Sequence, residues 1–353
     1  MAEFTLNQLL EYTIKAGASD LHLLVDSAPT VRIDGDLVAV AGAEILRNGQ
    51  IEKLIGASMS PEQYQLFLSN KDLDCSLSLE DKARFRVNAY FQRGVPSASF
   101  RSIPLKVNTI DKLGLPQICH NVTKLKQGFV LVTGPTGSGK STTISSILEE
   151  INQTRPAHIV TIEDPIEFVH RSAKSLISQR EIRADTLSWN IALKAVLRED
   201  PDVVLIGEMR DYETIAAALT IAETGHLVFA TLHTNSAAQT IDRIVDVFPE
   251  NQQSQVKMQL SSVLQVVISQ RLVPKKGGGR VVACEIMMAE DSIKTAIRDG
   301  KTHMIDNILT TSRDKGMQLL ETDLARLVKS GVFDFETGRN YSVRPNELVR
   351  QMG

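Results

Sequence analysis

The nine residues GPTGSGKST, at positions 134–142, constrain the fold of this chain more strongly than any other stretch. They match the pattern G-x-x-x-x-G-K-[ST] and follow FVLVT, an apolar run typical of a buried strand. Glycines let the backbone curl so that successive N–H groups point at phosphate oxygens, and a helix that begins at Lys140 adds the positive end of its dipole. The stretch therefore predicts a phosphate-binding loop between a strand and a helix.

The residue types in this loop also indicate how it would hold a nucleotide. The Lys140 ammonium is expected to reach the β- and γ-phosphates, and the Ser141 hydroxyl is expected to ligate Mg²⁺. The predicted nucleotide-binding residues of the loop are Gly134, Pro135, Thr136, Gly137, Ser138, Gly139, Lys140, Ser141 and Thr142.

Between residues 125 and 275, short apolar runs alternate with segments of helical pattern. The runs are FVLVTG, HIVTIED, DVVLIGE and LVFATLHT, and helices are predicted at 186–199 and 211–223. Strands that alternate with helices indicate a parallel sheet covered on both faces. We therefore expect an α/β core at 117–283, followed by a mainly helical segment at 284–353.

The first hundred residues have a different pattern. An amphipathic helix is predicted at the start, and ARFRVNAYFQRG then alternates apolar residues with Arg84, Arg86 and Asn88, as a half-buried strand does. This pattern predicts a small α+β domain at 1–100, joined to the core by a linker at 101–116.

Charge and cysteine content narrow the class of protein. The chain has 353 residues, a net charge of −3 and a pI of about 6.2, whereas a protein that coats nucleic acid normally carries a basic excess. Cys75, Cys119 and Cys284 lie far apart with no CxxC pair, which argues against a zinc site and fits a reducing compartment. No apolar run approaches the roughly 20 residues of a membrane span. We expect a cytoplasmic protein that binds no nucleic acid, does not insert into a membrane and acts there only through partners.

Turnover of a bound nucleotide needs a group that positions the attacking water, and PDVVLIGEMRD supplies a candidate. Its apolar strand ends at Gly207-Glu208, which places Glu208 at the carboxyl edge of the sheet, where ligands bind in open α/β folds. P-loop enzymes generally carry a Mg²⁺-binding Asp before such a Glu, and here that position is Gly207. A surface glutamate that caps the next helix is the alternative for Glu208.

Two further groups of polar residues border predicted strands of the core. In TIEDPIEF, Glu163, Asp164 and Glu167 are candidates to help hold Mg²⁺ or position water, and a solvated acidic loop is the alternative. In GHLVFATLHT, His226 and His233 flank an apolar strand, and near pH 7 each can donate a hydrogen bond to phosphate or carry charge. Satisfied histidines at the rim of the core are the alternative for both.

Four stretches, in this order, resemble the Walker A, Asp box, Walker B and His box of the secretion-type hexameric ATPases: GPTGSGKSTT, TIEDPIEF, DPDVVLIGEMRD and TGHLVFATLHTNSAAQTIDRIVDVFP. That family drives type IV pili and type II secretion, and within it the chain is similar to the PilT/PilU branch of retraction motors over nearly its whole length. The resemblance implies an N-terminal PAS-like domain, a RecA-like P-loop core, a C-terminal helical segment, and a homohexamer that binds ATP between neighbouring subunits.

The resemblance also implies roles for individual residues of the core. Glu208 would act as the catalytic base, His233 would sense the γ-phosphate, and Glu163 of the Asp box would assist. His226 would support the His-box loop and through it the nucleotide. Arg210 would contact phosphate or, as the alternative, pair with a neighbouring acid such as Asp211 or Glu213.

Arginines of the N-terminal domain are a separate part of the implied site. In the family they face the phosphates, and guanidinium suits that role because its planar fork pairs with phosphate oxygens and stays charged. The matching candidates are Arg84, Arg86 and Arg101, for which exposed strand arginines are the alternative.

Two features bear on the direction in which such a motor works. Assembly ATPases of the family carry a four-cysteine zinc segment and a long N-terminal extension, neither of which is present here. Retraction motors carry the motif AIRNLIRE, and the aligned stretch here is SIKTAIRD at 292–299, in which Lys294 and Thr295 replace Arg and Asn.

We therefore expect a Mg²⁺-dependent ATPase that powers pilus retraction and twitching motility. Its expected partners are copies of itself, an inner-membrane platform protein with the pilus machinery at the cytoplasmic face, and a second retraction ATPase. The alternatives are an accessory retraction paralogue, a pilus-assembly or type II secretion ATPase, and a nucleotide-binding scaffold. A nucleic-acid translocase is disfavoured by the net charge.

Overall fold

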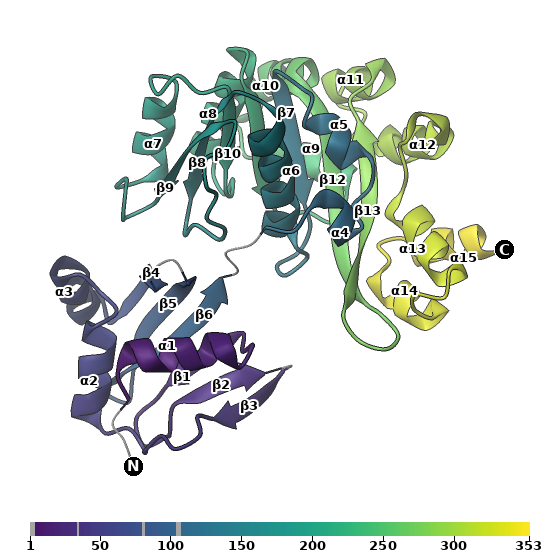
Figure 1. Ribbon diagram of the computed structural model, residues 1–353. Helices are drawn as coiled ribbons and strands as arrows, with labels where there is room; N and C mark the ends of the chain where they lie inside the picture. The colour runs from purple at the N-terminus through teal and green to yellow at the C-terminus, as the bar shows by residue number, and fades with distance from the viewer. Residues whose placement is uncertain (1–3, 34, 80–81, 104–106) are drawn as a thin grey trace. The chain divides into compact units, whose positions relative to one another are not determined.

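The computed structural model describes residues 4–33, 35–79, 82–103 and 107–353 (Figure 1). The chain divides into two compact units, each with its own sheet and hydrophobic core. The N-terminal unit comprises residues 1–106 and 165–169, and the core unit comprises residues 107–164 and 170–353.

The N-terminal unit is built on a six-stranded antiparallel sheet with the strand order β3-β2-β1-β6-β5-β4. Its strands are β1 (Asp20–Leu23), β2 (Thr30–Ile33), β3 (Asp36–Ala39), β4 (Asp72–Leu79), β5 (Ala83–Gln92) and β6 (Val95–Ile103). Its helices are α1 (Leu6–Lys15) against β1, α2 (Asn48–Gly56) against β6 and α3 (Pro61–Asn70) against β4. A capping box of Thr5 and Gln8 starts α1 by satisfying free backbone donors at its end.

The predicted alternation along β5 is confirmed. Phe85, Val87 and Ala89 are fully buried in the core that the sheet shares with its helices, while Arg84 and Arg86 project from the opposite face. The linker predicted at 101–116 begins inside this sheet, because β6 continues to Ile103, and its residues 104–106 lie outside the described part of the chain.

The core unit is built on a seven-stranded sheet with the order β13-β12-β7-β11-β10-β8-β9. All neighbours are parallel except β13, which runs antiparallel to β12. The strands are β7 (Gly128–Thr133), β8 (His158–Glu163), β9 (Leu176–Glu181), β10 (Val203–Ile206), β11 (Leu227–Leu232), β12 (Leu264–Pro274) and β13 (Arg280–Met288). The predicted parallel sheet is confirmed.

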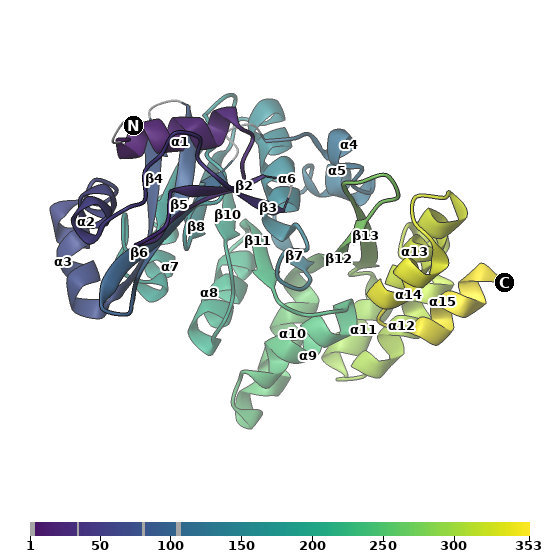
Figure 2. The same cartoon turned by 90° about the horizontal axis from the view of Figure 1, so that it is seen from below.

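Helices cover both faces of this sheet, as Figure 2 shows with α6 on one side and α8 to α10 on the other. The helices of the core are α4 (Ile110–Leu113), α5 (Ile118–Val122), α6 (Lys140–Thr154), α7 (Trp189–Val196), α8 (Tyr212–Glu223), α9 (Ala237–Asp246) and α10 (Glu250–Val263). Alternate residues of β7 explain the two layers: Val130 and Val132 pack with α6, and Phe129 and Leu131 pack with α8 and α9. The helices predicted at 186–199 and 211–223 correspond to α7 and α8.

The C-terminal segment begins within a strand. The segment predicted to be mainly helical from 284 opens with the second half of β13, which forms a hairpin with β12 around the glycine-rich loop at 275–279. Short apolar runs such as VVACEIMM do not distinguish a strand from a buried helix by period alone. Helical elements follow at α11 (Asp291–Arg298), Thr302–Met304, α12 (Ile305–Thr311), Arg313–Lys315, α13 (Leu320–Lys329), α14 (Phe335–Tyr341) and α15 (Pro345–Met352).

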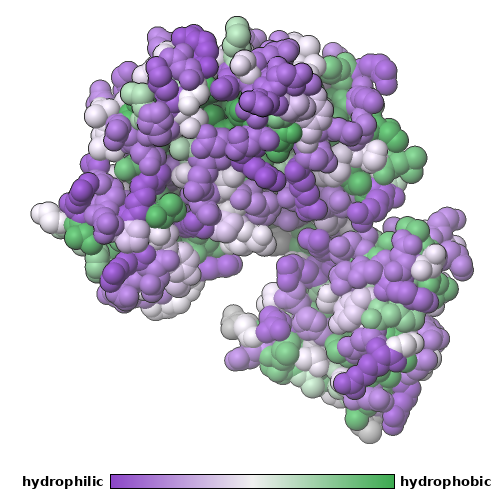
Figure 3. Space-filling model, turned by 180° about the vertical axis from the view of Figure 1, so that it is seen from behind, coloured by the Kyte–Doolittle hydropathy of each residue, from purple (hydrophilic) through white to green (hydrophobic). Residues whose placement is uncertain are grey.

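The surface is mostly hydrophilic on the face drawn in Figure 3, where hydrophobic residues form small separate groups. Among the residues that the structure describes, no helix combines the length and apolar character needed to cross a membrane.

Candidate active site

The phosphate loop lies between β7 and α6, as the sequence predicts. Gly134, Gly137 and Gly139 have φ angles of 143°, 78° and 88°, in the region that L side chains rarely adopt. At Gly134 an added Cβ would also lie 2.4 Å from the backbone oxygen of Gln270. The loop conformation therefore depends on glycine both for its dihedral angles and for its close approach to β12.

Lys140 and Ser141 occupy the first turn of α6. Lys140 Nζ donates to the carbonyl oxygens of Gly134 at 2.9 Å and Pro135 at 3.1 Å, which holds the ammonium over the loop. No group of three His, Cys, Asp or Glu side chains among the described residues is arranged to hold a metal ion. Mg²⁺ does not need one, because it keeps several waters and takes phosphate oxygens as ligands, so a single hydroxyl such as that of Ser141 fits it.

A brace from β12 holds this loop, and the sequence analysis missed it. Gln270 is buried, and its Nε2 donates to the backbone oxygen of Ser138 at 2.6 Å. The preceding Ser269 hydroxyl lies 2.7 Å from that of Thr133 at the end of β7. Neither contact can be recognised from neighbouring residues in the sequence, because the pairing of β12 with β7 brings the partners together.

Glu208 lies at the carboxyl edge of the sheet, just after β10. Arg210 Nη2 donates to Glu208 Oε2 at 2.7 Å, and His233 Nε2 lies 3.3 Å from Glu208 Oε1. His233 Nδ1 also lies 3.5 Å from the hydroxyl of Thr136 in the phosphate loop. The helix-capping alternative for Glu208 is wrong, since Asp211 caps α8 by accepting from the Thr214 N–H.

The electrostatics of this group favour a carboxylate beside a neutral imidazole at pH 7. Partial burial alone would raise the pKa of Glu208, but the hydrogen bond and charge of Arg210, with His233 and Lys140, lower it overall. Burial, together with the charges of Lys140 and Arg210, lowers the pKa of His233 below its ordinary value. A neutral His233 can donate from Nε2 towards Glu208 while Nδ1 accepts from Thr136.

Gly207 lies close to Glu163 of the neighbouring strand β8. A Cβ added at Gly207 would lie 3.2 Å from the Ile162 oxygen and 3.5 Å from Glu163 Cγ, so β8 leaves little room for a side chain there. Glu163 is buried and accepts from the Thr161 hydroxyl at 2.7 Å and from Gln179 Nε2 at 3.3 Å. The buried side chain of Glu163 thus lies beside Gly207, the position at which P-loop enzymes generally carry a Mg²⁺-binding Asp.

Asp164 of TIEDPIEF lies near arginines of the core unit. Its Oδ2 lies 3.9 Å from Arg183 Nη2, and its charge, after the hydrogen bond and charge of Glu208, raises the pKa of Arg210. Glu167 belongs to the segment 165–169, which groups with the N-terminal unit.

His226 lies at the opposite edge of the core sheet from His233. It precedes β11, whereas His233 follows that strand. Its Nδ1 lies 3.0 Å from the Thr224 hydroxyl and 3.2 Å from the Ile221 oxygen, and its backbone oxygen accepts from the N–H of Gly128. Within this chain the structure does not bring His226 to the phosphate loop, and its contacts are those of the alternative, a satisfied histidine at the rim.

The arginines of the N-terminal unit lie together on the polar face of its sheet. Arg86 on β5 is the cross-strand neighbour of Arg101 on β6. Arg84 Nη2 donates to the Ser76 hydroxyl at 2.6 Å, Arg86 Nη2 lies 3.7 Å from Asp74 Oδ2, and Arg101 Nε donates to Asp20 at 2.9 Å. The Arg101 side chain is nevertheless 70% exposed. Their contact with nucleotide stays a prediction.

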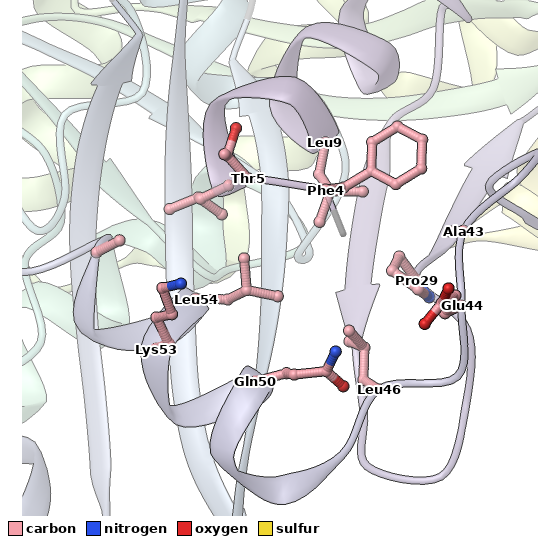
Figure 4. Close-up of a pocket in the computed structure, with 12 residues that line it drawn as sticks. Phe4, Thr5, Leu9, Pro29, Ala43, Glu44, Leu46, Gln50, Lys53 and Leu54 are labelled. Carbon is pink, nitrogen blue, oxygen red and sulfur yellow. The ribbon is translucent and has the colours of Figure 1, made fainter. Parts of the chain in front are cut away.

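A separate pocket of about 300 Å³ lies within the N-terminal unit, between the start of α1, α2 and the loop before it (Figure 4). Its lining is mainly apolar, with Phe4, Leu9, Leu46 and Leu54 among the labelled side chains. It contains none of the predicted site residues, so the candidate active site is the carboxyl edge of the core sheet.

Comparison with known proteins indicates an ATPase of the same family, and the similarity extends over nearly the whole chain. The chain is 48% identical over 343 residues to the type IV pilus retraction ATPase PilT of Pseudomonas aeruginosa, which covers 97% of this chain and 99% of that protein. It is 47% identical over 312 residues to a twitching motility protein of Neisseria gonorrhoeae, covering 88% and 83%. A crystal structure of the pilus retraction motor PilT with bound ADP superposes with a TM-score of 0.92 at 44% identity, covering 98% of this chain and 99% of that one.

A family model for type II/IV secretion system proteins matches residues 1–336. The match includes the phosphate loop, Glu208 and His233, which the structure brings together at one edge of the core sheet. This chain belongs to the type II/IV secretion system protein family of ATPases.

Proposed function

We propose that this chain is the ATP-hydrolysing subunit of a homohexameric motor that powers the retraction of type IV pili. The observation that carries the proposal is the convergence of the phosphate loop, Glu208 and His233 at one edge of the core sheet. The similarity of nearly the whole chain to a pilus retraction ATPase supports the direction of the motor.

The geometry suggests a role for each group in hydrolysis. Backbone N–H groups of the loop and Lys140 bind the phosphates, and Glu208, as a carboxylate, orients the attacking water and accepts its proton. His233, neutral at pH 7, reports on the γ-phosphate through its position between Glu208 and Thr136. Mg²⁺, held by Ser141 and the phosphates, would neutralise charge on the β- and γ-oxygens. The products are ADP and inorganic phosphate.

The assembly and its location are part of the proposal. If each site is completed by arginines of a neighbouring N-terminal unit, the contact is heterologous, and a closed ring is its natural outcome. The ring would dock on a platform protein at the cytoplasmic face of the inner membrane, a location that the similarity to a pilus retraction ATPase supports.

Replacing Glu208 tests the chemistry directly. Glu208→Gln keeps the size of the side chain and loses the base, so kcat for ATP should fall by about 100-fold or more while ADP affinity is retained. Glu290→Gln, at an exposed ion pair with Lys315, is a matched control and should hydrolyse ATP normally. Normal turnover by Glu208→Gln would show that the assigned base is wrong.

The direction of the motor is tested in the native host. Glu208→Gln on the chromosome should give many surface pili with no twitching if hydrolysis drives retraction. Cells without pili would instead indicate an assembly motor.

An accessory retraction subunit is the second candidate, because the stretch 292–299 departs from the retraction motif. It forms most of α11, where Ile293, Ala296 and Ile297 are buried, whereas Thr295 is exposed and Lys294 half-buried. The two substitutions thus change the surface of the helix and leave its core intact. Restoration of twitching by this chain alone, in a host lacking every other retraction ATPase, would favour the principal motor.

A further inference from the structure

The loop that carries His233, defined here as residues 233–236, is held at several points by side chains that lie outside it. The Thr234 hydroxyl lies 2.7 Å from that of Thr240, and Arg271 Nη2 donates to Asn235 Oδ1 at 2.9 Å. At the end of the loop, the N–H of Ala237 donates to Glu285 Oε1 at 2.7 Å. The position of His233 beside Glu208 therefore depends on these anchors.

Glu285 is the buried carboxylate among these anchors. Its side chain is 1% exposed, and it accepts from the first residue of α9, where backbone N–H groups have no partner within the helix. A carboxylate at this point is also favoured by the helix dipole. Burial raises the pKa of Glu285, while Arg344 and the Ala237 N–H act against that rise.

Arg344, which precedes α15, holds Glu285 from the other side. Its Nη1 lies 3.0 Å from Glu285 Oε2 and 3.3 Å from Glu321 Oε2, and its Nε and Nη2 donate to the two oxygens of Asp306 at 2.7 and 2.6 Å. Glu321 Oε1 accepts in turn from the backbone N–H of Arg344 at 2.8 Å. One guanidinium thus joins β13 to α12, α13 and the start of α15, all of them elements of the C-terminal part of the chain, drawn from light green to yellow in Figure 1.

The charged composition of the cluster around Arg344 suggests a role besides stabilising the fold. Three carboxylates surround Arg344, and two of them are almost fully buried. Buried ion pairs stabilise a fold less efficiently than apolar packing, and apolar residues of α13 to α15 already pack on the β12–β13 hairpin. The charged groups hold the C-terminal helices in a fixed position relative to the end of the His233 loop.

We propose that Glu285 is a positioning residue, which holds the loop of His233 in its working geometry and is itself held by Arg344 of the C-terminal helices. Displacement of these helices then changes the rate of hydrolysis without changing the nucleotide-binding loop. This inference rests on the proposed ATP hydrolysis and adds to it a route by which the C-terminal segment controls turnover.

Glu285→Gln is the primary test, in the full chain. Glutamine keeps the volume and an acceptor oxygen for the Ala237 N–H, but it removes the charge that faces Arg344. We expect kcat for ATP to fall by about tenfold, with the KM for ATP and the affinity for ADP within about twofold of wild type. A purely structural role would lower the thermal midpoint and leave kcat per folded molecule unchanged.

Substitutions of Arg344 are the second test. Arg344→Gln should lower kcat, and Arg344→Lys should recover part of it because the charge is kept. The double variant Glu285→Gln/Arg344→Gln should be about as slow as the slower single variant, since the two act as one unit. Arg350→Gln is the matched control, because Arg350 lies on α15, which directly follows Arg344, is 80% exposed and pairs with the nearby Glu347.

The outcomes separate this inference from the proposed function. If wild type hydrolyses ATP and Glu285→Gln keeps a kcat within about twofold of it, the inference is wrong and the proposed function stands. A change confined to KM, or an equal loss in Arg350→Gln, would also overturn it. If Arg344→Gln fails to fold, Glu285→Gln decides alone. Absence of turnover in wild type would overturn the proposed function itself.

Discussion

At the carboxyl edge of the core sheet, Glu208 and His233 follow different strands and lie 3.3 Å apart. On the polar face of the N-terminal sheet, Arg84, Arg86 and Arg101 lie along two strands, and each contacts a hydroxyl or an acid of a neighbouring strand. The first region converges because parallel strands end at the same edge. The second spreads because residues on one face of antiparallel strands form a row.

The residues of the first region meet within one unit of the chain, whereas the arginines of the second region lie on a face of the N-terminal sheet, where contact with a neighbouring subunit is part of the proposal. Lys140, Glu208 and His233 interact electrostatically within the core unit. The arginines have local partners that hold them in place, yet Arg101 is largely exposed. Binding and chemistry should therefore respond differently to substitutions in the two regions.

The largest effect is expected in the core, at the phosphate loop. Lys140→Ala removes charge-assisted bonds to two phosphates, so the affinity for ADP or ATP should fall on the order of 1,000-fold. Isothermal titration with ADP measures the loss, with Lys126→Ala, an exposed lysine of the same unit, as control. Retention of wild-type affinity would contradict the assigned role of the loop.

The next effect is expected in the N-terminal sheet and concerns rate rather than binding. Arg101→Gln or Arg86→Gln should lower kcat by about 100-fold, while ADP affinity stays within about threefold, because the loop is intact. Steady-state turnover of the assembled protein is the measurement. Arg47→Gln, at an exposed ion pair of the same unit, is the control. Wild-type rates in both arginine variants would mean that this face does not serve the nucleotide.

A smaller effect concerns the stability of the phosphate-loop helix. His170 Nδ1 lies 2.9 Å from Glu149 Oε2, and this hydrogen bond lowers the pKa of Glu149 to about 2. A carboxyl with a lowered folded pKa stabilises above its unfolded pKa of 4.5 and loses that contribution as pH falls towards 2. Glu149→Gln should cost about 1–2 kcal/mol at pH 7, allowing for solvent screening.

Thermal unfolding between pH 7 and pH 3 measures this contribution. The gap between wild type and Glu149→Gln should narrow as the pH falls, and a gap that is constant with pH would contradict the assignment. Glu223→Gln, whose hydrogen bond to Gln259 is exposed, is the control.

The smallest effect is expected at His226, which lies at the amino edge of the core sheet. His226→Gln should change kcat by less than about twofold and cost about 0.5–1 kcal/mol through the lost ring contacts. ATP turnover and thermal unfolding of this variant measure both. A tenfold loss of kcat would instead indicate that His226 reaches a nucleotide in an assembled neighbour. The core unit would then also contribute to a neighbouring site, contrary to the comparison above.

Much of the site could be predicted because its signals are local. The phosphate loop and its flanking strand and helix lie in one continuous segment, and Glu208 and His233 each follow an apolar run that marks a buried strand. The partner of Arg210 was not predicted, since Asp211 and Glu213 were the acids considered for it. The structure pairs Arg210 with Glu208, while Asp211 caps α8.

The groups that were missed are those whose partners are far away in the chain. Gln270 contacts the oxygen of Ser138 from a distance of 132 residues in sequence, and Glu285 meets the Ala237 N–H across 48 residues. The strands β9, β12 and β13 were missed for a related reason, since all three are defined by their pairing rather than by their period. Two of them, β9 and β13, lie at the edges of the sheet, and β12 pairs with β7 and β13.

The sequence by itself determined the phosphate loop, the alternation of strands and helices, and the family. These depend on glycine dihedral angles and on hydrophobic periods, which act over a few residues. The tertiary structure decided which strands are neighbours, and with them the brace at Gln270, the contact of His233 with Glu208 and the anchor at Glu285. Hydrogen bonds and ion pairs require approach to within about 3–4 Å, and only the packed sheet order brings residues so distant in sequence that close.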